Sequence, residues 1–259
     1  MRIDILTLFP EMFTGYLQTS MLAKARTLAL IDVRVHNIRD FARGKHRITD
    51  EPPYGGGGGM VLIPGPIFTA VESIISAAPA DRFGENKSSQ IPIILLTPQG
   101  RKFDQTIAKE LKEQDHLIFI CGRYEGVDER IRQHLATDEI SIGDYVMTGG
   151  ELAALVVVDA VARLIPGVLG AEGAELNDSF EDGLLEGPHY THPRDFRGWL
   201  VPDVLQSGDL GAVKRWRRQM ALRRTWQRRP DLLLTANLTE EDKYFLAVLA
   251  EEASEEIDR

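Results

Sequence analysis

The sequence predicts an α/β protein in which a parallel sheet flanked by helices is followed by a small helical domain. Through the first two thirds of the chain, short apolar runs rich in β-branched residues alternate with amphipathic stretches. Such alternation is typical of parallel strands joined by right-handed helical crossovers. Beyond residue 187 the pattern changes to two long stretches of helical periodicity. The 259 residues are enough for one main domain and a smaller one.

The predicted elements of the first domain follow one another in a regular order. Each strand is a short run rich in Val, Ile and Leu, and strands are expected at residues 2–9, 31–38, 91–97, 116–122 and 138–146. Apolar residues recur at helical spacing around these strands, which predicts helices at residues 16–29, 64–78, 103–114, 127–135 and 150–165. A polar loop over residues 76–90 overlaps the last turn of the second helix.

The chain is expected to have three parts. They are an α/β domain over residues 1–170, an interdomain linker over 171–187 and a helical domain over 188–259. The linker is acidic, punctuated by glycines and only weakly periodic. In the last domain, the second long helix begins with a Thr-x-x-Asp cap formed by Thr239 and Asp242.

The composition is that of a globular protein in water. Hydrophobic residues make up 43% of the chain, charged residues make up 27%, and no stretch has the length and apolarity of a membrane span. The start, MRIDILTLFP, has neither the apolar core nor the cleavage site of a secretory signal, so a cytoplasmic location and no membrane partner are expected. The single cysteine, Cys121, excludes an internal disulfide and a Cys-rich zinc site, and we expect it to be buried.

Charge is distributed unevenly along the chain. The net charge of −9 argues at first against a nucleic-acid partner, because polyanions are held mainly by Lys and Arg. The segment Lys214–Arg229, however, has eight basic residues in sixteen and no acid, while the tail after Thr239 is acidic. A locally basic face on an acidic protein can still bind RNA.

Three turns at predicted strand ends could form one ligand pocket. They are Leu95–Gly100, Ile120–Arg130 and Ser141–Glu151, and each combines glycine with polar or aromatic groups. Because ligands of open α/β sheets collect beyond the carboxyl ends of the strands, the turns predict a site for a nucleoside-type ligand held largely by main-chain atoms. The chain has no phosphate loop of the G-x-x-x-x-G-K-[ST] type and no G-x-G-x-x-G after its first strand, which disfavours ATP or GTP hydrolysis and NAD binding.

The segment PPYGGGGGM, residues 52–60, contains five consecutive glycines. Glycine loses more backbone freedom on folding than any other residue, so the run indicates either a flexible linker or a backbone that comes close to something bulky. We favour close approach, because Tyr54 and Met60 bracket the run and predicted structure continues on both sides.

Seven motifs resemble those of the bacterial tRNA (guanine-N1)-methyltransferases, a TrmD-like family of the SPOUT superfamily. In chain order they are PYGGGGGM, LLTPQGRKFDQ, CGRYEGVDERI, SIGDYVMTGGELA, IPGVLG, NDSFEDGLLEGPHYTHP and RTWQRRPDLL. The resemblance implies a C-terminal trefoil knot in the α/β domain and S-adenosyl-L-methionine as the methyl donor. It also implies a homodimer whose active sites are shared between subunits, and methylation of N1 of the guanosine at tRNA position 37, next to the anticodon.

The resemblance also implies roles for individual residues. N1 of guanine carries a proton, so its methylation requires a base, and a nearby cation is needed for the charge that develops on O6. By the family pattern the base is Asp178 and the cation is Arg163. From the sequence alone, Asp178 could equally be a solvated linker acid or a helix cap, and Arg163 a last-turn arginine of its helix.

Two sets of binding residues are expected, the first from the family pattern. The donor is expected to contact Leu95, Leu96, Thr97, Pro98, Gly122, Glu125, Gly126, Ile142, Tyr145, Met147, Gly149 and Gly150. From the residues themselves, RNA is expected to contact Gly57, Gly58, Gly59 and a subset of Arg215, Arg218, Arg223 and Arg224, while Trp216 and Trp226 pack in the core; the arginines could instead be merely solvated. His189 and Tyr190 are expected to shape the linker or to contact RNA. Tyr145 and Met147 could instead be core residues, and Glu125 could pair with Arg123 or Arg130.

Several alternatives stay open at this level. The rival activity is a SPOUT-type ribose 2′-O-methyltransferase, and the rival class is an RNA-binding module without catalysis. His189 and His192 lack the spacing of metal ligands on a helix, so no metal site is predicted, and no motif indicates whether magnesium takes part. Glu186 stands where the family often has Asp, which puts its expected contact with the donor in question.

Overall fold

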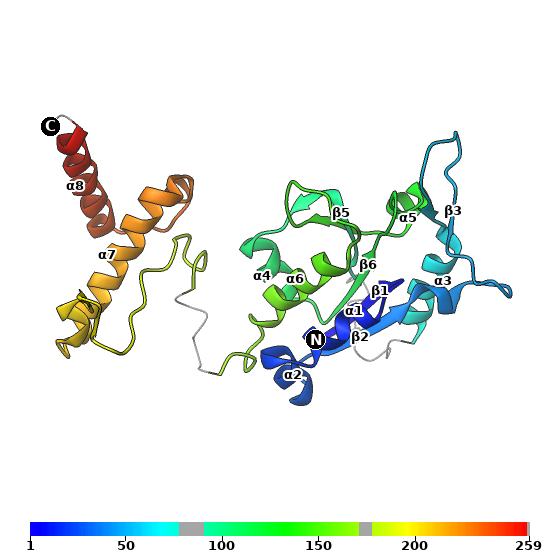
Figure 1. Ribbon diagram of the computed structural model, residues 1–259, viewed down its shortest axis with the longest axis horizontal. Helices are drawn as coiled ribbons and strands as arrows, with labels where there is room; N and C mark the ends of the chain where they lie inside the picture. Colours follow the sequence, from blue (N-terminus) through cyan, green and yellow to red (C-terminus); the bar gives the residue numbers. More distant parts are fainter. Residues whose placement is uncertain (78–90, 171–177, 258–259) are drawn as a thin grey trace, which may run out of the picture. The chain divides into compact units, whose positions relative to one another are not determined.

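The computed structural model describes residues 1–77, 91–170 and 178–257, which form two compact units. The first unit comprises Met1–Glu172 and the second Gly173–Arg259. Each unit has its own secondary structure, shown in Figure 1. None of the helices in these described ranges is long and apolar enough to cross a membrane.

The first unit is built on a five-stranded parallel sheet. Its order is β2-β1-β6-β5-β7, so β5 lies between two strands that follow it in the sequence. The strands are β1 (Arg2–Thr7), β2 (Asp32–Asn37), β5 (Ile93–Lys102), β6 (His116–Cys121) and β7 (Asp138–Ser141). All five lie within or overlap the strands expected from the sequence.

Helices cover both faces of this sheet (Figure 1). One face packs on α1 (Glu11–Leu17), α2 (Ser20–Thr27), α4 (Gln105–Lys112) and α6 (Glu151–Ala162). The other packs on η1 (Ile38–Phe41), α3 (Pro64–Ser76) and α5 (Glu129–His134). The division follows the strand period, since Ile3 and Ile5 of β1 face the first group and Leu6 the second.

Three predicted boundaries were wrong. The single helix expected at residues 16–29 is two helices, because Thr19 between them is extended (φ −123°, ψ 151°). Strand β5 runs five residues beyond its predicted end at Thr97, with a shift of register against β7 between Leu96 and Arg101. Strand β7 stops at Ser141 instead of residue 146, because the chain then turns away from the sheet.

Gly100 permits this irregular pairing of β5 with β7. A Cβ at this position would lie 2.4 Å from the carbonyl carbon of Glu139 and from the backbone nitrogen of Ile140. No side chain fits at that separation, so the two backbones meet only where glycine stands.

A short hairpin carries the glycine run next to the sheet. Its strands are β3 (Asp50–Glu51) and β4 (Val61–Leu62), which pair antiparallel across the loop. Leu62 of β4 also forms a parallel bridge with Val127. The hairpin is thereby attached to the segment that follows β6.

The second unit contains two long helices and a small hairpin. Its elements are β8 (Asp195–Phe196), β9 (Trp199–Leu200), η4 (Asp203–Gln206), α7 (Leu210–Arg228), η5 (Pro230–Leu234) and α8 (Glu240–Ile257). The Thr-x-x-Asp cap of α8 is confirmed: Asp242 accepts from the backbone of Thr239 (2.9 Å), and the Thr239 hydroxyl accepts from that of Asp242 (3.2 Å).

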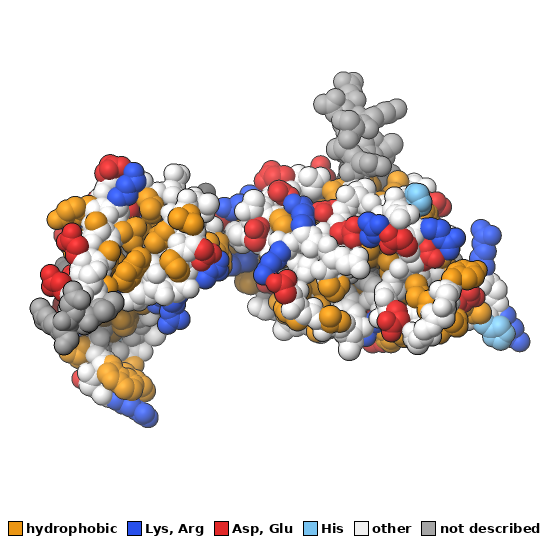
Figure 2. Space-filling model, turned by 90° about the horizontal axis from the view of Figure 1, so that it is seen from above, with side chains coloured by type: hydrophobic (Ala, Val, Ile, Leu, Met, Phe, Trp, Pro, Cys, Tyr) orange, Lys and Arg blue, Asp and Glu red, His pale blue; other side chains and the backbone are white. Residues whose placement is uncertain are grey.

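The interior of the second unit is small. Leu184, Leu222, Thr225 and Leu249 are buried, whereas Trp216 and Trp226 are only half-buried, so the expectation that both tryptophans lie in the core was wrong. Hydrophobic side chains are correspondingly visible on the surface of this unit (Figure 2).

The described part of the expected linker, residues 178–187, packs on the helices of the second unit. The backbone of Leu185 donates to the hydroxyl of Thr225 (2.9 Å), and the guanidinium of Arg224 donates to the carbonyl of Glu186 (2.9 Å). Gly187 lies against the backbone of Arg217 on α7. This segment therefore has fixed neighbours within its own unit, while residues 171–177 lie outside the described ranges.

Candidate functional site

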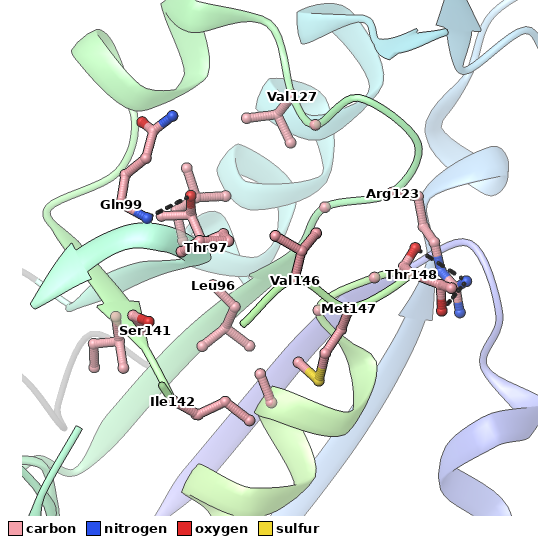
Figure 3. Close-up of a pocket in the computed structure, with 18 of the residues that line it drawn as sticks. Leu96, Thr97, Gln99, Arg123, Val127, Ser141, Ile142, Val146, Met147 and Thr148 are labelled. Carbon is pink, nitrogen blue, oxygen red and sulfur yellow. Dashed lines mark hydrogen bonds between the residues drawn. The ribbon is translucent and has the colours of Figure 1, made fainter. Parts of the chain in front are cut away.

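One cavity of the described residues lies at the register shift of β5 and at the carboxyl ends of β6 and β7 (Figure 3). Its volume is about 270 Å³. All three segments singled out in the sequence contribute to its wall. The segments after β6 and β7 lie there because parallel strands deliver their carboxyl ends to one edge of a sheet, whereas residues 95–99 lie within β5, at its register shift. The wall combines apolar side chains with exposed main chain, which suits a flat heterocycle bearing a polar tail.

The structure brings together all twelve residues that the sequence indicated for the donor. From β5 these are Leu95, Leu96, Thr97 and Pro98; after β6 they are Gly122, Glu125 and Gly126; and after β7 they are Ile142, Tyr145, Met147, Gly149 and Gly150. Further wall residues were not singled out, namely Gln99, Arg123, Tyr124, Val127, Ile140, Ser141, Gly143, Val146, Thr148 and Ala153. Nearly all of these residues lie inside the motifs quoted from the sequence, so membership in a motif is the signal that could have identified them.

The turn after β6 is shaped by two residues with positive φ. Tyr124 has φ 60° and Gly126 has φ 121°, and the backbone of Gly126 donates to the carbonyl of Arg123 (3.0 Å). This tight turn exposes backbone groups on the cavity side and leaves the ring of Tyr124 half-exposed. A bulky residue held in the left-handed region is uncommon and is typical of functional turns.

Backbone hydrogen bonds join this turn to the glycine-run hairpin. Glu125 donates to Met60 (3.0 Å), Leu62 donates to Gly126 (3.0 Å), and Asp128 donates to Leu62 (2.9 Å). A Cβ on Gly59 would lie 2.5 Å from Oε1 of Glu125. Close approach therefore explains Gly59, whereas Gly55, Gly56 and Gly57 have positive φ with open space around them.

The arginines near Glu125 pair with other carboxylates. Nε of Arg123 lies 3.0 Å from Oε2 of Glu151, and Arg130 pairs with Asp128 at 2.7 Å. The structure therefore does not support the alternative that Glu125 pairs with Arg123 or Arg130. Its carboxylate lies instead over Gly59, at the rim of the cavity.

The turn after β7 closes the other side of the cavity. The hydroxyl of Tyr145 donates to the carbonyl of Ile142 (3.3 Å), and the ring is 56% exposed, so Tyr145 is no core residue. Gly143 has φ 154°, and a Cβ there would lie 2.4 Å from the Tyr145 ring. Met147 is partly buried against the core of the first unit, and Figure 3 shows it among the residues that line the cavity.

Cys121 is the last residue of β6 and is fully buried beneath the cavity. Burial raises the pKa of its thiol well above the ordinary value, the nearby Glu151 raises it further, and Arg123 partly opposes the shift. The neutral thiol is a packing group, as expected from the sequence.

Asp178 and Arg163 belong to different units. Arg163 is the exposed residue at the carboxyl end of α6 in the first unit. Asp178 is half-buried in the second unit, where its carbonyl accepts from the backbone of Glu181 (3.3 Å). Within the described ranges, no group of three or more His, Cys, Asp or Glu side chains is arranged to hold a metal ion.

The four arginines expected on RNA fall into two pairs. Arg218 donates to Asp242 (2.9 Å), to Asp182 and to the carbonyl of Asn237, and Arg224 donates to the carbonyls of Glu186 and Gly187. Arg215 and Arg223 are exposed on the same helix, where Arg223 lies 3.9 Å from a carboxylate oxygen of Glu252 in a surface ion pair. Two of the four thus hold their own unit together through partly buried contacts, and the other two lie at the surface.

The two aromatic candidates lie beside α7. The ring of Tyr190 lies 6.3 Å from that of Trp216, with the planes tilted by 53°. Nε2 of His189 lies 3.5 Å from a carboxylate oxygen of Glu186. Both residues contribute to a second, more open cavity of the helical unit.

Comparisons with known proteins agree on one family. The model described as tRNA (guanine-1)-methyltransferase TrmD matches residues 1–235. A tRNA (guanine-N(1)-)-methyltransferase of Brevibacillus brevis is 57% identical over 252 residues, covering 97% of this chain and 99% of the relative. Proteins of the same name from Moorella thermoacetica and Dehalococcoides mccartyi are 54% and 53% identical, covering 98% and 97% of this chain and 99% and 98% of the relatives.

Proposed function

Because this chain belongs to the tRNA (guanine-1)-methyltransferase family, we propose that it transfers a methyl group from S-adenosyl-L-methionine to N1 of the guanosine at tRNA position 37. That it is a tRNA methyltransferase follows from the match, which spans nearly the whole chain at more than half identity to relatives of that name. This match is the observation that carries the assignment. The donor, the target position and the residue roles are the finer part of the proposal.

The cavity at the sheet edge fits S-adenosyl-L-methionine. Leu96, Ile142 and Met147 offer apolar surface to an adenine ring, and Gly122, Gly149 and Gly150 leave backbone groups open to polar atoms. A Cβ at Gly150 would lie 2.9 Å from Cα of Cys121, so at this part of the wall the two backbones are in direct contact. When bound, the donor supplies an electrophilic methyl group.

Asp178 is the proposed base that removes the proton from N1 of guanine. Its carboxylate would take the N1 proton as the bond between N1 and the methyl carbon forms and the bond from that carbon to the donor's sulfur breaks, which leaves S-adenosylhomocysteine and a neutral methylated base. Arg163 faces the negative charge that develops on O6. These two roles rest on the resemblance of NDSF and AVARLIPG to the family pattern.

A second copy of the chain is proposed to complete each active site. Met12 and Tyr16 on α1 and Leu152 and Val156 on α6 are each spaced by four residues and lie 39–54% exposed on two helices in contact. An apolar face of this kind is typical of a dimer interface. In the dimer, Asp178 of one chain would serve the cavity of its partner.

The double variant L152E/V156E tests this part of the proposal. Two carboxylates on the apolar face should yield monomers in sedimentation or light scattering, with loss of methyl transfer but retention of the fold. The variant E110Q/E113Q, altered at exposed positions at the carboxyl end of the nearby α4, should remain dimeric. An active monomeric L152E/V156E protein would refute the shared site.

The trefoil knot implied by the resemblance is likewise a proposal. The position of β5 between the later strands β6 and β7 supports it, because the chain must return past its own earlier segments to make this order. A cytoplasmic location belongs to the same proposal, since the tRNA substrate is found there.

The proposed reaction is tested by locating the new methyl group. Purified protein, an unmodified tRNA transcript and S-adenosyl-L-methionine are incubated, and nuclease digests are analysed by mass spectrometry. We expect 1-methylguanosine at position 37. Methylation of a ribose oxygen would favour the rival SPOUT activity, and absence of heat on titration with S-adenosyl-L-methionine would favour a non-catalytic RNA-binding protein.

A further inference from the structure

Two walls of the donor cavity are joined directly by their backbones. The turn after β6 and the segment before α6 meet where Gly150 donates to the carbonyl of Gly122 (3.0 Å). Arg123 and Gly149 form an isolated antiparallel bridge beside this hydrogen bond. The separation of the two walls therefore depends on the side chains that pack where these two segments meet.

A buried ion pair lies at this junction. Glu151, the first residue of α6, has a side chain only 1% exposed, and its Oε2 is 3.0 Å from Nε of Arg123, whose side chain is 15% exposed. The hydroxyl of Thr7, at the end of β1, donates to Oε1 of Glu151 (2.7 Å). The carboxylate thus links β1, the turn after β6 and α6.

Arg123 extends the connection to the second wall. Its guanidinium donates to the carbonyl of Thr148 (3.3 Å), as drawn in Figure 3, and lies 4.5 Å above the ring of Phe9. It also contacts the sulfur of Met12 (3.1 Å). One side chain therefore touches both cavity walls and the first helix.

Gly149 makes room for this pair. A Cβ on Gly149 would lie 2.3 Å from Nε of Arg123 and 2.5 Å from Oε2 of Glu151. The glycine is thus required by the ion pair on one side, independently of any ligand on the other. The ion pair and the backbone of Gly149 therefore pack directly against each other.

The geometry of the pair is poor for stability. Nε of Arg123 and Oε2 of Glu151 are buried and attract each other by charge, but neither atom makes a well-oriented hydrogen bond. Strong Arg–carboxylate pairs are bidentate and well aligned, and a buried pair that is not often contributes less than apolar residues of the same volume. Stability therefore does not explain why the Arg123–Glu151 pair lies where the two cavity walls meet, and another role is required.

We propose that Arg123 and Glu151 are a positioning pair that holds the two cavity walls at the separation S-adenosyl-L-methionine requires. The inference rests on the proposed function, since it concerns the donor site of that reaction. Neither residue needs to touch the donor's reacting atoms. The pair keeps the Thr148–Gly150 segment against the turn after β6 before the donor arrives, so that little ordering remains to be done on binding.

Conservative variants separate positioning from folding. In E151Q the amide oxygen can still accept from Thr7 while the charge is lost, and R123K keeps the charge without the planar group that spans both walls. We expect each variant to raise the dissociation constant for S-adenosyl-L-methionine by about 10–100-fold in calorimetry. The effect should appear mainly in the KM for the donor, so raising the donor concentration should restore most of kcat.

The matched control is D32N, which alters an exposed pair of the same unit. Asp32 and Arg34 lie 2.7 Å apart on β2 with both side chains about half exposed, so loss of this charge should leave donor affinity unchanged. Wild-type affinity in both E151Q and R123K would overturn the proposal. Failure of the wild-type protein itself to bind the donor would instead overturn the proposed function.

The double variant R123M/E151M decides between a positioning role and a structural one. Removing both buried charges avoids the unpaired guanidinium that destabilises E151Q, so the melting temperature should return towards that of the wild type. Donor affinity should remain weak, because no side chain then connects Thr148 to residue 151 and Thr7. Recovery of affinity together with stability would show that the pair acts only on folding, and the double variant decides the question even where a single variant fails to fold.

Discussion

Gly59 of the glycine run and Glu125 of the cavity turn lie against each other, so that a Cβ at residue 59 would displace the Glu125 side chain. The hydrogen bond from the backbone of Glu125 to the carbonyl of Met60 fixes the two segments side by side. A loop expected on RNA and a turn expected on the donor are thus parts of one structure.

G59A should destabilise the protein, whereas G58A should not. Gly59 has φ +87°, where a Cβ is strained, and the added atom would also strike the Glu125 side chain. The free energy of unfolding of G59A should fall by about 1–2 kcal/mol. Gly58 has open space and no such φ, so G58A is the matched control in urea unfolding. Equal stability of the two variants would show that the Gly59–Glu125 contact is not tight in solution.

D178N should abolish turnover without weakening donor binding. An amide is nearly the same size as the carboxylate but cannot take the N1 proton, so kcat should fall by about 10²–10⁴. Calorimetry with S-adenosyl-L-methionine should give the wild-type affinity. Near-normal turnover would remove Asp178 from the mechanism.

Arg223 and Arg218 should give opposite phenotypes although they lie on one helix. Arg223 is exposed, so R223Q should weaken tRNA binding and reduce the dependence of log K on log salt, with the melting temperature unchanged. In R218Q the buried carboxylate of Asp242 loses its arginine partner, so the melting temperature should fall. A salt slope in R223Q equal to that of the wild type would place Arg223 off the RNA.

Acid should destabilise the first unit through Asp4. Burial alone would raise the pKa of Asp4, but hydrogen bonds from His116, His36 and Arg2 hold this pKa well below its ordinary value. A lowered pKa in the folded state stabilises the protein above the unfolded pKa, and that contribution is lost as the pH falls below about 4. Urea unfolding between pH 7 and pH 3 should therefore show a shallower acid-side loss in D4N. The same slope in both proteins would contradict this account.

The sequence determined the order of helices and strands along the chain and the turns that follow β6 and β7, but not the end of β5, which continues to Lys102. Leu95–Pro98, Gly122–Gly126 and Ile142–Gly150 could be assigned to one site because parallel strands end at one edge of a sheet, and the structure gathers them around one cavity. The helix cap formed by Thr239 and Asp242 could also be predicted, because it depends only on two residues three positions apart. Local periodicity and strand direction are properties of short segments.

Only the tertiary structure decided which distant groups pair. Arg123 and Glu151 are far apart in sequence, and nothing in either motif marks them as partners until β6 and α6 pack together. Arg218 and Arg224 look like Arg215 and Arg223 in the sequence, yet they turn inward because Asp242 and the backbone of Glu186 and Gly187 lie beside them. A side chain's partner is set by the packing of elements that the sequence places far apart, and packing is not a local property.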